Sequence, residues 1–425
     1  MQVNDIYALF LENPSVETDT RKLKKGDIFF ALKGPNYNGN HYTQQALQAG
    51  ASYCIADEPS DNKDDRIILV ENCLSMLQQL AKKHRQQFNI PFIAITGSNG
   101  KTTTKELLQQ VISSSYKSYT TLGNLNNHIG VPLTILRIKQ DAEIAIIEMG
   151  ANHQKEIEGY CEYTMPTHGI ITNIGKAHLE GFGGEEGIKK GKGELFEYLK
   201  KNAGTAFINN DSETLIEISK GIKEVITYGT INADYTGIVQ NDESYLQVKI
   251  TKGANLPLIK SQLIGNYNLP NILAAVCVGK YFNVPDNKIK DAIESYTPSN
   301  SRSQLIKKDS NEIILDAYNA NPSSMKAAIE NFAKMKGDKK ILILGSMMEL
   351  GADSDKEHEG IISLIKKYNW EDVVLTGDGF KDIPDGFLHF TFSTEAAKWF
   401  KQKRIENTLV LIKGSRSMQM EKVLE

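Results

Sequence analysis

The amino-acid sequence predicts an α/β protein of three domains. At 425 residues the chain is too long for one ordinary hydrophobic core, so two or three domains are expected. Short apolar runs alternate with segments of helical spacing, which is typical of parallel α/β sheets. Several of these runs end in polar turns, where such sheets carry their functional residues. We therefore expect domains at residues 1–88, 89–298 and 299–425.

Charge and cysteine usage narrow the class of protein. The chain has 49 basic and 52 acidic residues, and this near balance argues against nucleic-acid binding through bulk charge. Residues 1–10 do not resemble a signal peptide, and no apolar run approaches the length of a membrane span. Four scattered cysteines without CxxC spacing are expected to be reduced thiols of a cytoplasmic protein: Cys54, Cys73, Cys161 and Cys277.

The first domain is expected to be a small α/β unit. Strands are predicted over residues 27–32, 52–56 and 67–70, and helices over 44–49 and 74–86. Between them, residues 33–41 are rich in glycine and asparagine, a composition that favours a plain surface loop.

The second domain is organised around a glycine-bounded turn after a strand expected at residues 90–95. The turn is Gly97-Ser98-Asn99-Gly100-Lys101-Thr102-Thr103, and helical spacing follows over 104–113. Glycines let backbone N–H groups close around a phosphate chain, and the helix N-terminus adds positive partial charge. We expect Lys101 on the terminal phosphates and the Thr102 hydroxyl on Mg²⁺. Because the glycine spacing is shorter than the standard phosphate-loop pattern, an ordinary strand-to-helix turn is the alternative.

Two further strand ends carry side chains that can bind a metal. Glu148 ends the strand expected at 143–149, and His178 follows the strand expected at 169–174. Since parallel strands end at one edge of a sheet, Thr102, Glu148 and His178 are expected to meet there. Each alone is more often a satisfied polar residue than a ligand, but together they indicate a divalent-cation site.

Two helical segments of this domain have structural interpretations by default. The lysine-rich stretch at residues 187–196, which contains Lys192, favours a solvated helix face. The segment 265–275 opens a helix, and Asn268 and Asn271 in its first turn are typical capping residues.

The third domain is expected to be a second parallel, Rossmann-like α/β unit. Strands are predicted over residues 312–315, 341–345, 373–377 and 409–414, with helices between them. The GxGxxG fingerprint of dinucleotide sites is absent, so NAD binding is not expected.

The order of these motifs resembles the Mur ligase family of ATP-dependent amide ligases in bacterial peptidoglycan precursor synthesis. The turn at 96–103 resembles the family's short phosphate loop, and Ser301-Arg302 resembles its arginine motif. Residues 265–271 resemble its G-x-x-N-x-x-N helix, with Tyr267 where many members have His. Lys192 aligns with the lysine that the family carbamylates.

Further motifs resemble the family member that joins D-alanyl-D-alanine to UDP-N-acetylmuramoyl-tripeptide. They lie at residues 123–127, 148–151, 178–183 and 316–322. The member that adds the third amino acid shares the Asp19-Thr20-Arg21 type of N-terminus, but its usual D-N-P-R motif is missing here. Folylpolyglutamate synthase, a more distant relative, lacks such a UDP-binding first domain. Another alternative is a phosphate-loop NTPase or nucleotide-binding regulator without ligase activity, which would need neither Lys192 nor His178.

The resemblance implies a role for each motif. ATP would contact Gly97, Ser98, Asn99, Gly100, Lys101, Thr102, Thr103, Asn271, Arg302 and Asp316. Two Mg²⁺ ions would be held by Thr102 and Glu148, and by His178 and carbamylated Lys192. Lys101, Lys192 and His178 would be the catalytic residues. The UDP-sugar-binding first domain would use Thr20, Arg21, Lys33 and Gly34, and further substrate contacts would come from Asn124, Asn126, Asn127, Asn319 and Asn321.

The resemblance also implies the chemistry and the setting. The tripeptide carboxylate would attack the γ-phosphate of ATP to give an acyl phosphate, and the dipeptide amine would then displace phosphate. The partners would be small-molecule substrates, without nucleic acid or membrane insertion, and the enzyme would be a cytoplasmic monomer of cell-wall synthesis.

Overall fold

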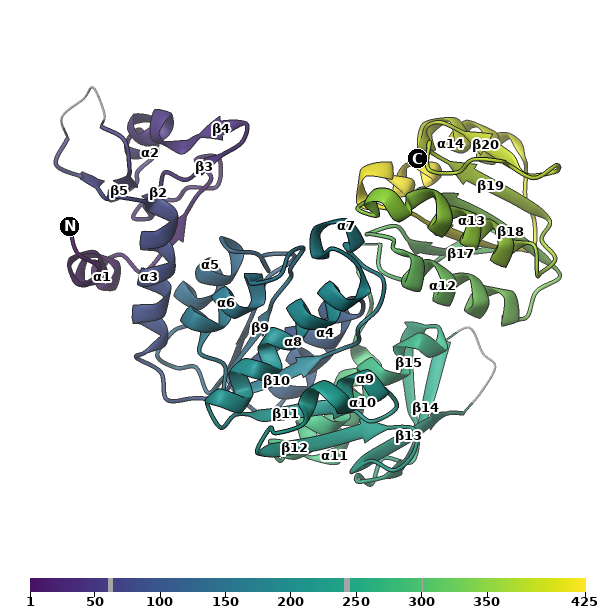
Figure 1. Cartoon of the computed structure of the whole chain (residues 1–425), viewed down its shortest axis with the longest axis horizontal. Helices are drawn as coiled ribbons and strands as arrows, with labels where there is room; N and C mark the ends of the chain where they lie inside the picture. Colours follow the sequence, from purple (N-terminus) through teal and green to yellow (C-terminus); the bar gives the residue numbers. More distant parts are fainter. Residues whose placement is uncertain (60–63, 241–244, 300) are drawn as a thin grey trace.

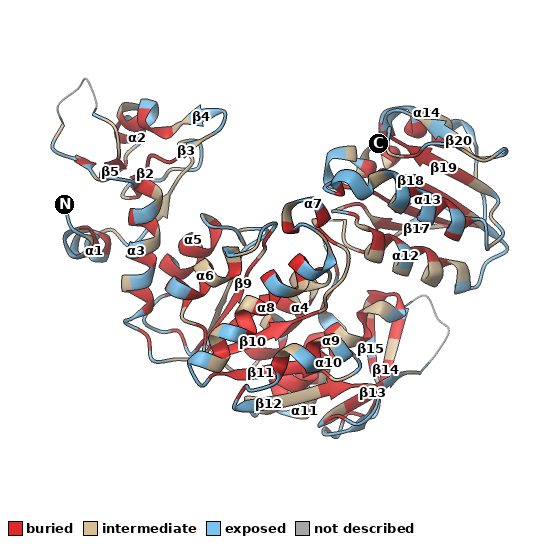
Figure 2. Cartoon of the chain, in the orientation of Figure 1, coloured by how far each residue is buried: buried red, intermediate tan, exposed pale blue. Residues whose placement is uncertain are grey.

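The computed structural model describes residues 1–59, 64–240, 245–299 and 301–425. The chain forms three α/β units, each with its own main sheet, and the N-terminal and C-terminal units lie at opposite ends of the central one (Figure 1). The strands form the buried layers of these units (Figure 2). The structure thus confirms the predicted three-domain α/β fold. Within the described residues, no helix is both long and apolar enough to cross a bilayer.

The N-terminal unit is a four-stranded parallel sheet in the order β1-β2-β5-β6. Its elements are α1 (Val3–Glu12), β1 (Val16–Glu17), β2 (Ile28–Phe30), α2 (Thr43–Gln48), β5 (Tyr53–Ala56), β6 (Ile67–Leu69) and α3 (Cys73–Arg85). The stretch 33–41 was expected to be a plain loop but folds as a hairpin of β3 (Lys33–Gly34) and β4 (Tyr37–Asn38) leading into the 3₁₀ turn η1 (Gly39–Tyr42). Asn40 fixes this stretch, because its side-chain amide donates to Asn38 and Asp57, both at 2.9 Å.

Helix α3 fastens the N-terminal unit to the central one. The buried Arg85 guanidinium donates to the carbonyls of Phe88, Thr164 and Met165. It also lies 3.7 Å from the centre of the Phe92 ring. Every partner is neutral, so burial lowers the pKa of Arg85 to about 10.

The central unit is a nine-stranded sheet in the order β15-β14-β13-β12-β11-β10-β7-β9-β8. Its strands are β7 (Phe92–Thr96), β8 (Ser118–Thr120), β9 (Ile144–Glu148), β10 (His168–Ile171), β11 (Thr205–Asn209), β12 (Glu224–Gly229), β13 (Tyr235–Val239), β14 (Tyr245–Lys252) and β15 (Ile259–Ile264). Its helices are α4 (Lys101–Ser113), α5 (Gly130–Leu136), α6 (Glu156–Thr164), α7 (Leu179–Phe182), α8 (Glu185–Lys201), α9 (Glu213–Ser219), α10 (Leu269–Tyr281) and α11 (Asp286–Ser295). The strands from β8 to β13 pair in parallel as expected, whereas β14 and β15 add an antiparallel extension that was not predicted.

Apolar spacing explains how α4 is placed. Leu107, Leu108, Val111 and Ile112 are fully buried and share one core with the apolar side chains of α10. This packing holds the start of α4 at the carboxyl end of the central strand β7, whose five residues are all buried.

The C-terminal unit is a six-stranded sheet in the order β16-β17-β21-β18-β19-β20. Its elements are β16 (Gln304–Lys308), β17 (Asn311–Asp316), α12 (Pro322–Lys334), β18 (Lys339–Gly345), α13 (Ser354–Ile365), β19 (Asp372–Thr376), β20 (Leu388–Phe390), α14 (Ser393–Gln402) and β21 (Thr408–Lys413). The sheet is parallel as expected, except that the unpredicted edge strand β16 pairs antiparallel with β17. This hairpin brings the residues before β16 next to those after β17.

Candidate functional site

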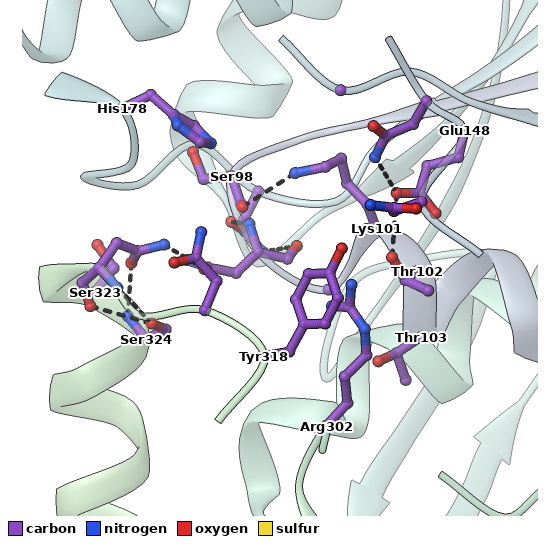
Figure 3. A pocket seen from close by; sticks show the side chains of 18 of the residues that line it. Ser98, Lys101, Thr102, Thr103, Glu148, His178, Arg302, Tyr318, Ser323 and Ser324 are labelled. Atoms are coloured by element: carbon purple, nitrogen blue, oxygen red, sulfur yellow. Dashed lines mark hydrogen bonds between the residues drawn. The ribbon is translucent and has the colours of Figure 1, made fainter. Parts of the chain in front are cut away.

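A cavity of about 600 Å³ lies between the central and C-terminal units. The central unit lines it with the turn after β7, the loop after β8, the end of β9 and the start of α10. The C-terminal unit adds the segments before β16 and after β17, the first turns of α12 and the end of β21. Figure 3 shows side chains from both units converging on this space.

The phosphate-loop glycines stand where no other residue fits. Gly100 precedes α4 in the left-handed region, with φ 79°, and a Cβ there would lie 2.7 Å from Asn271 Oδ1. Gly97 has φ 136°, and a Cβ there would lie 2.1 Å from Thr172 Oγ1. The loop is therefore shaped by backbone conformation and by the close approach of neighbouring side chains. Helix α4 begins at Lys101, earlier than expected, so its N-terminus opens directly into the cavity.

Lys101 is folded back onto its own loop. Its Nζ donates to the carbonyls of Gly97 at 2.7 Å and Ser98 at 3.3 Å. Burial lowers the pKa of Lys101; the negative charge of Glu148 opposes this shift, and the positive charge of Arg302 adds to it. Among the described residues the ammonium thus donates only to neutral carbonyls, and a phosphate would offer it a better partner.

Glu148, at the end of β9, carries a buried oxygen without a partner. Its Oε1 accepts from Thr102 Oγ1 at 3.1 Å and from Asn126 Nδ2 at 2.7 Å (Figure 3). Its Oε2 is buried and has no hydrogen-bond partner among the described residues. An unpaired carboxylate oxygen beside a threonine hydroxyl fits a hard divalent cation, because the cation would replace the lost hydration.

Lys192 is buried, contrary to the expectation of a solvated helix face. It lies in the third turn of α8 with no exposed surface, and its Nζ donates to the carbonyl of Ala151 at 2.8 Å and lies 4.8 Å from the centre of the Phe182 ring. Burial lowers the pKa of Lys192 well below its ordinary value, and the nearby Lys101 charge acts in the same direction. Since Ala151 lines the cavity, this amine lies directly behind the cavity wall.

His178 lies at the boundary between the two units. It has a left-handed backbone, φ 56°, and lines the cavity just before α7. Its Nδ1 is 2.5 Å from Glu349 Oε2, which comes from the loop after β18 in the C-terminal unit. This proximity lowers the pKa of the Glu349 carboxyl.

Asn271 is already hydrogen-bonded within the protein. Its Oδ1 accepts from Thr104 Oγ1 at 3.1 Å, and its Nδ2 donates to Asn268 Oδ1 at 2.8 Å. The capping interpretation was wrong, because Asn268 stands at the cap of α10 without a side-chain cap hydrogen bond and Asn271 bonds side chains instead. Asn271 also lines the cavity beside Gly100, so it ties the start of α10 to the phosphate loop.

The C-terminal unit supplies a cation and a partly buried ion pair. Arg302 Cζ lies 3.5 Å from the centre of the Tyr318 ring, and both residues line the cavity. Asp316 accepts from Lys413 Nζ at 2.6 Å and from the backbone N–H of Ser303 at 3.0 Å. The two predicted residues Arg302 and Asp316 are thus brought to the same wall.

The remaining predicted residues fall into two groups. The cavity is lined by Asn124, Asn126, Asn127, Asn319 and Asn321. Thr20, Arg21, Lys33 and Gly34 lie in the N-terminal unit and do not line it. Of these, Arg21 is largely exposed and pairs with Asp19 at 2.7 Å, and Lys33 lies 3.1 Å from both Asp57 and Glu58.

Several lining residues were not singled out in the sequence. Tyr318 lies inside the predicted stretch 316–322, and Ser323 and Ser324 directly follow it. Asn173 supports the phosphate loop, because its Oδ1 accepts the backbone N–H of Asn99 at 3.0 Å. The sequence could have marked Lys413 as a site residue, because it is a lysine at the carboxyl end of an apolar strand.

Comparisons with known proteins agree with this geometry. Residues 14–85 match the model "Mur ligase family, catalytic domain", residues 95–279 the Mur ligase middle domain, and residues 301–416 the "Mur ligase, glutamate ligase domain". The UDP-N-acetylmuramoyl-tripeptide–D-alanyl-D-alanine ligase of Bacillus subtilis is 34% identical over 96% of this chain and 92% of its own length. The Escherichia coli enzyme of the same name is 33% identical, with the same coverage of both chains.

Solved structures give the same result. A MurF structure from Acinetobacter baumannii superposes with a TM-score of 0.88 at 28% identity, covering 96% of this chain and 92% of that one. MurF from Thermotoga maritima, solved in complex with ADP, gives 0.86 at 28% identity and covers 97% of both chains. The chain therefore belongs to the Mur ligase family.

Proposed function

We propose that this protein joins D-alanyl-D-alanine to UDP-N-acetylmuramoyl-tripeptide, with conversion of ATP to ADP and phosphate. Full-length similarity to enzymes named for that reaction supports the choice of substrates. The observation that carries the proposal is the single cavity in which the phosphate loop, the unpaired Glu148 oxygen and Arg302 of the C-terminal unit face one another. A phosphate-transfer reaction needs these three components together.

In this proposal ATP occupies the cavity with its phosphates on the loop. The backbone N–H groups of residues 97–103 and Lys101 take the phosphate chain, while Arg302 and Asp316 take phosphate and ribose. Asn271 meets adenine near the start of α10, in addition to bracing the loop. Lys101 leaves the loop carbonyls to pair with the γ-phosphate, where charge develops.

Two divalent cations complete the charge balance. Thr102 and Glu148 would hold the first Mg²⁺, and His178 with a modified Lys192 would hold the second. When bound, Mg²⁺ neutralises phosphate charge and polarises the transferred group.

Lys192 is proposed to carry a carbamate. Its neutral amine would attack CO₂, forming an N–C bond, and the nitrogen would release one proton to leave an anionic carbamate. Burial supports this step, because it lowers the pKa of Lys192 and so keeps the nucleophilic form. An ammonium at this position would repel Mg²⁺, whereas a carbamate oxygen could bind it.

The reaction would proceed in two displacements. The tripeptide carboxylate attacks the γ-phosphorus in line, and ADP leaves with the bonding electrons. The D-alanyl-D-alanine amine then attacks the acyl phosphate carbon, loses a proton, and phosphate departs. Asn124, Asn126, Asn127, Asn319 and Asn321 would orient the reacting peptides, and Thr20, Arg21, Lys33 and Gly34 would hold the UDP-sugar.

An acceptor screen tests this function directly. ADP release is measured with UDP-N-acetylmuramoyl-tripeptide and a panel of D- and L-dipeptides, and D-alanyl-D-alanine is expected to give the highest rate. Turnover with UDP-N-acetylmuramoyl-dipeptide and a single amino acid would instead identify the ligase of the third residue. Hydrolysis of ATP that ignores every acceptor would identify a simple NTPase. We further propose a cytoplasmic monomer, which gel filtration with light scattering can test.

A further inference from the structure

The Arg302 guanidinium faces the cavity without an anionic partner. No acidic side chain forms an ion pair with it in the part of the chain that the structure describes, although Asp316 lies on the same wall. Asp316 is instead engaged by Lys413 and Ser303. Lys101 approaches the same space and also lacks a carboxylate partner there. Two unpaired cations around one cavity favour an anionic ligand.

One aromatic ring fixes the orientation of this guanidinium. Arg302 Cζ lies 3.5 Å from the centre of the Tyr318 ring, so the planar group stacks on the ring face (Figure 3). Stacking uses the flat face of a guanidinium and leaves its N–H donors free at the edges. Those edge donors are the ones that bind a phosphate in bidentate fashion.

Hydrogen bonds join the segment around Arg302 to the segment around Tyr318. Ser301 and Ser303, on either side of Arg302, have left-handed backbones with φ 55° and 47°. The Tyr318 N–H donates to the Ser301 carbonyl at 3.2 Å, and the Ser303 N–H donates to Asp316 at 3.0 Å. Such conformations persist where the surrounding structure enforces them, often at ligand sites. The backbone that carries the Tyr318 ring is therefore held in one conformation relative to Arg302.

We propose that Tyr318 is a positioning residue that holds the Arg302 guanidinium edge-on toward the nucleotide phosphates. This inference rests on the proposed function, in which Arg302 meets phosphate. The aromatic face carries the effect and the phenol hydroxyl does not. Without the ring, the long Arg302 side chain must be ordered at the moment of binding, which weakens affinity.

Binding measurements on the full-length protein separate the ring from the hydroxyl. The dissociation constants of ATP, inorganic tripolyphosphate and adenosine are measured by calorimetry for the wild type, Tyr318→Phe, Tyr318→Leu and Tyr318→Met. Loss of the ring should weaken ATP and tripolyphosphate about three- to tenfold, the cost of ordering one long side chain on binding, and leave adenosine unchanged. Tyr318→Phe should stay within about twofold of wild type. Thermal melts show whether each variant is folded. Because there are two aliphatic replacements, the test still stands if one of them fails to fold.

A double-mutant cycle with Arg302→Ala tests whether Tyr318 acts through Arg302. Tyr318→Leu should add no further loss in the Arg302→Ala background. An equal loss of adenosine binding, or a Phe variant as weak as the Leu variant, would overturn the inference. If Arg302→Ala weakens tripolyphosphate binding but Tyr318→Leu does not, the positioning role alone is wrong. If Arg302→Ala has no effect, the phosphate role of Arg302 in the proposed function fails as well.

Discussion

Replacing Lys192 tests the part of the proposed site that the sequence alone favoured least. Its amine is fully buried, donates to one carbonyl at 2.8 Å and has no acidic hydrogen-bond partner among the described residues. Lys192→Ala removes four side-chain atoms and leaves a space close in size to a short carboxylic acid. Lys192→Met fills most of the same space with an unbranched apolar chain that is one atom shorter, and it serves as the matched control.

The expected magnitudes follow from what each variant removes. Losing an oxygen ligand that offsets developing phosphate charge should lower turnover by a factor on the order of 10²–10³ in both variants. Lys192→Met loses one hydrogen bond to Ala151, worth about 1 kcal/mol, but avoids burying an amine, so it should fold normally. Lys192→Ala should lose about 2–4 kcal/mol to the cavity it creates.

ADP release under saturating substrates is the assay, with and without added acetate or propionate. Partial rescue is expected for Lys192→Ala, because the acid can place its oxygens where the carbamate would lie, and none for Lys192→Met. Labelled ¹³CO₂ should give a carbamate carbon signal in the wild type only. Full activity of Lys192→Ala, or a wild type indifferent to removal of CO₂, would refute the reasoning.

Three other predictions concern the loop, acid stability and domain layout. Lys101→Ala should lower ligation by a factor of at least ~10² while the protein stays folded, and near-normal ligation would exclude this loop as the ATP site. Burial lowers the pKa of His168 to about 4, so between about pH 6.5 and 4 the unfolded chain binds a proton that the folded chain does not. The free energy of unfolding should therefore fall by about 2 kcal/mol from pH 7 to 5. His168→Phe, whose ring suits the aromatic cluster, should not show this decrease of about 2 kcal/mol when its unfolding by urea is measured at the two pH values. We also propose domain boundaries near residues 88 and 298, where limited proteolysis should cut first and substrates should protect; a single resistant core would contradict this.

The contact between Thr102 and Glu148 was predictable because strand order follows from simple rules. Strands β7 and β9 are neighbours in a parallel sheet, so the residues that follow them meet at one edge. That reasoning brought Thr102 and Glu148 together, and they lie 3.1 Å apart. The antiparallel β14 was missed, although its alternating burial over residues 245–252 matches the alternating polarity of its sequence.

The burial of Lys192 could have been predicted from its position in the helix, but the lysines beside it favoured a solvated face. It lies on the buried stripe formed with Ile188, Leu195 and Leu199, so a lysine occupies an apolar face of α8. The neighbouring Lys189 and Lys190 fall outside that stripe and made the whole run resemble a solvated surface. Position in the helical period, rather than local composition, distinguishes the buried lysine from the others.

The contact between Arg302 and Tyr318 could not be predicted in this way. The two residues are 16 positions apart, and they meet only because β16 and β17 form a hairpin whose open end faces the cavity. Neither strand has a glycine signal that marks its turn, and β16 is only partly buried. The geometry of a side-chain stack depends on that tertiary pairing and not on local pattern.

Polar contacts join the central and C-terminal units beside the cavity, and two of them are weak. Lys176 and Glu357 pair at 2.6 Å, and Asn321 donates to Asn99 at 2.7 Å, directly at the phosphate loop. Such partly exposed contacts contribute only about 0–1 kcal/mol each. Lys101 and Arg302 form no ion pair with any described residue and come from different units, so a bound phosphate chain would attract both. In the proposed function, a nucleotide that engages both cations is therefore expected to hold the two units together.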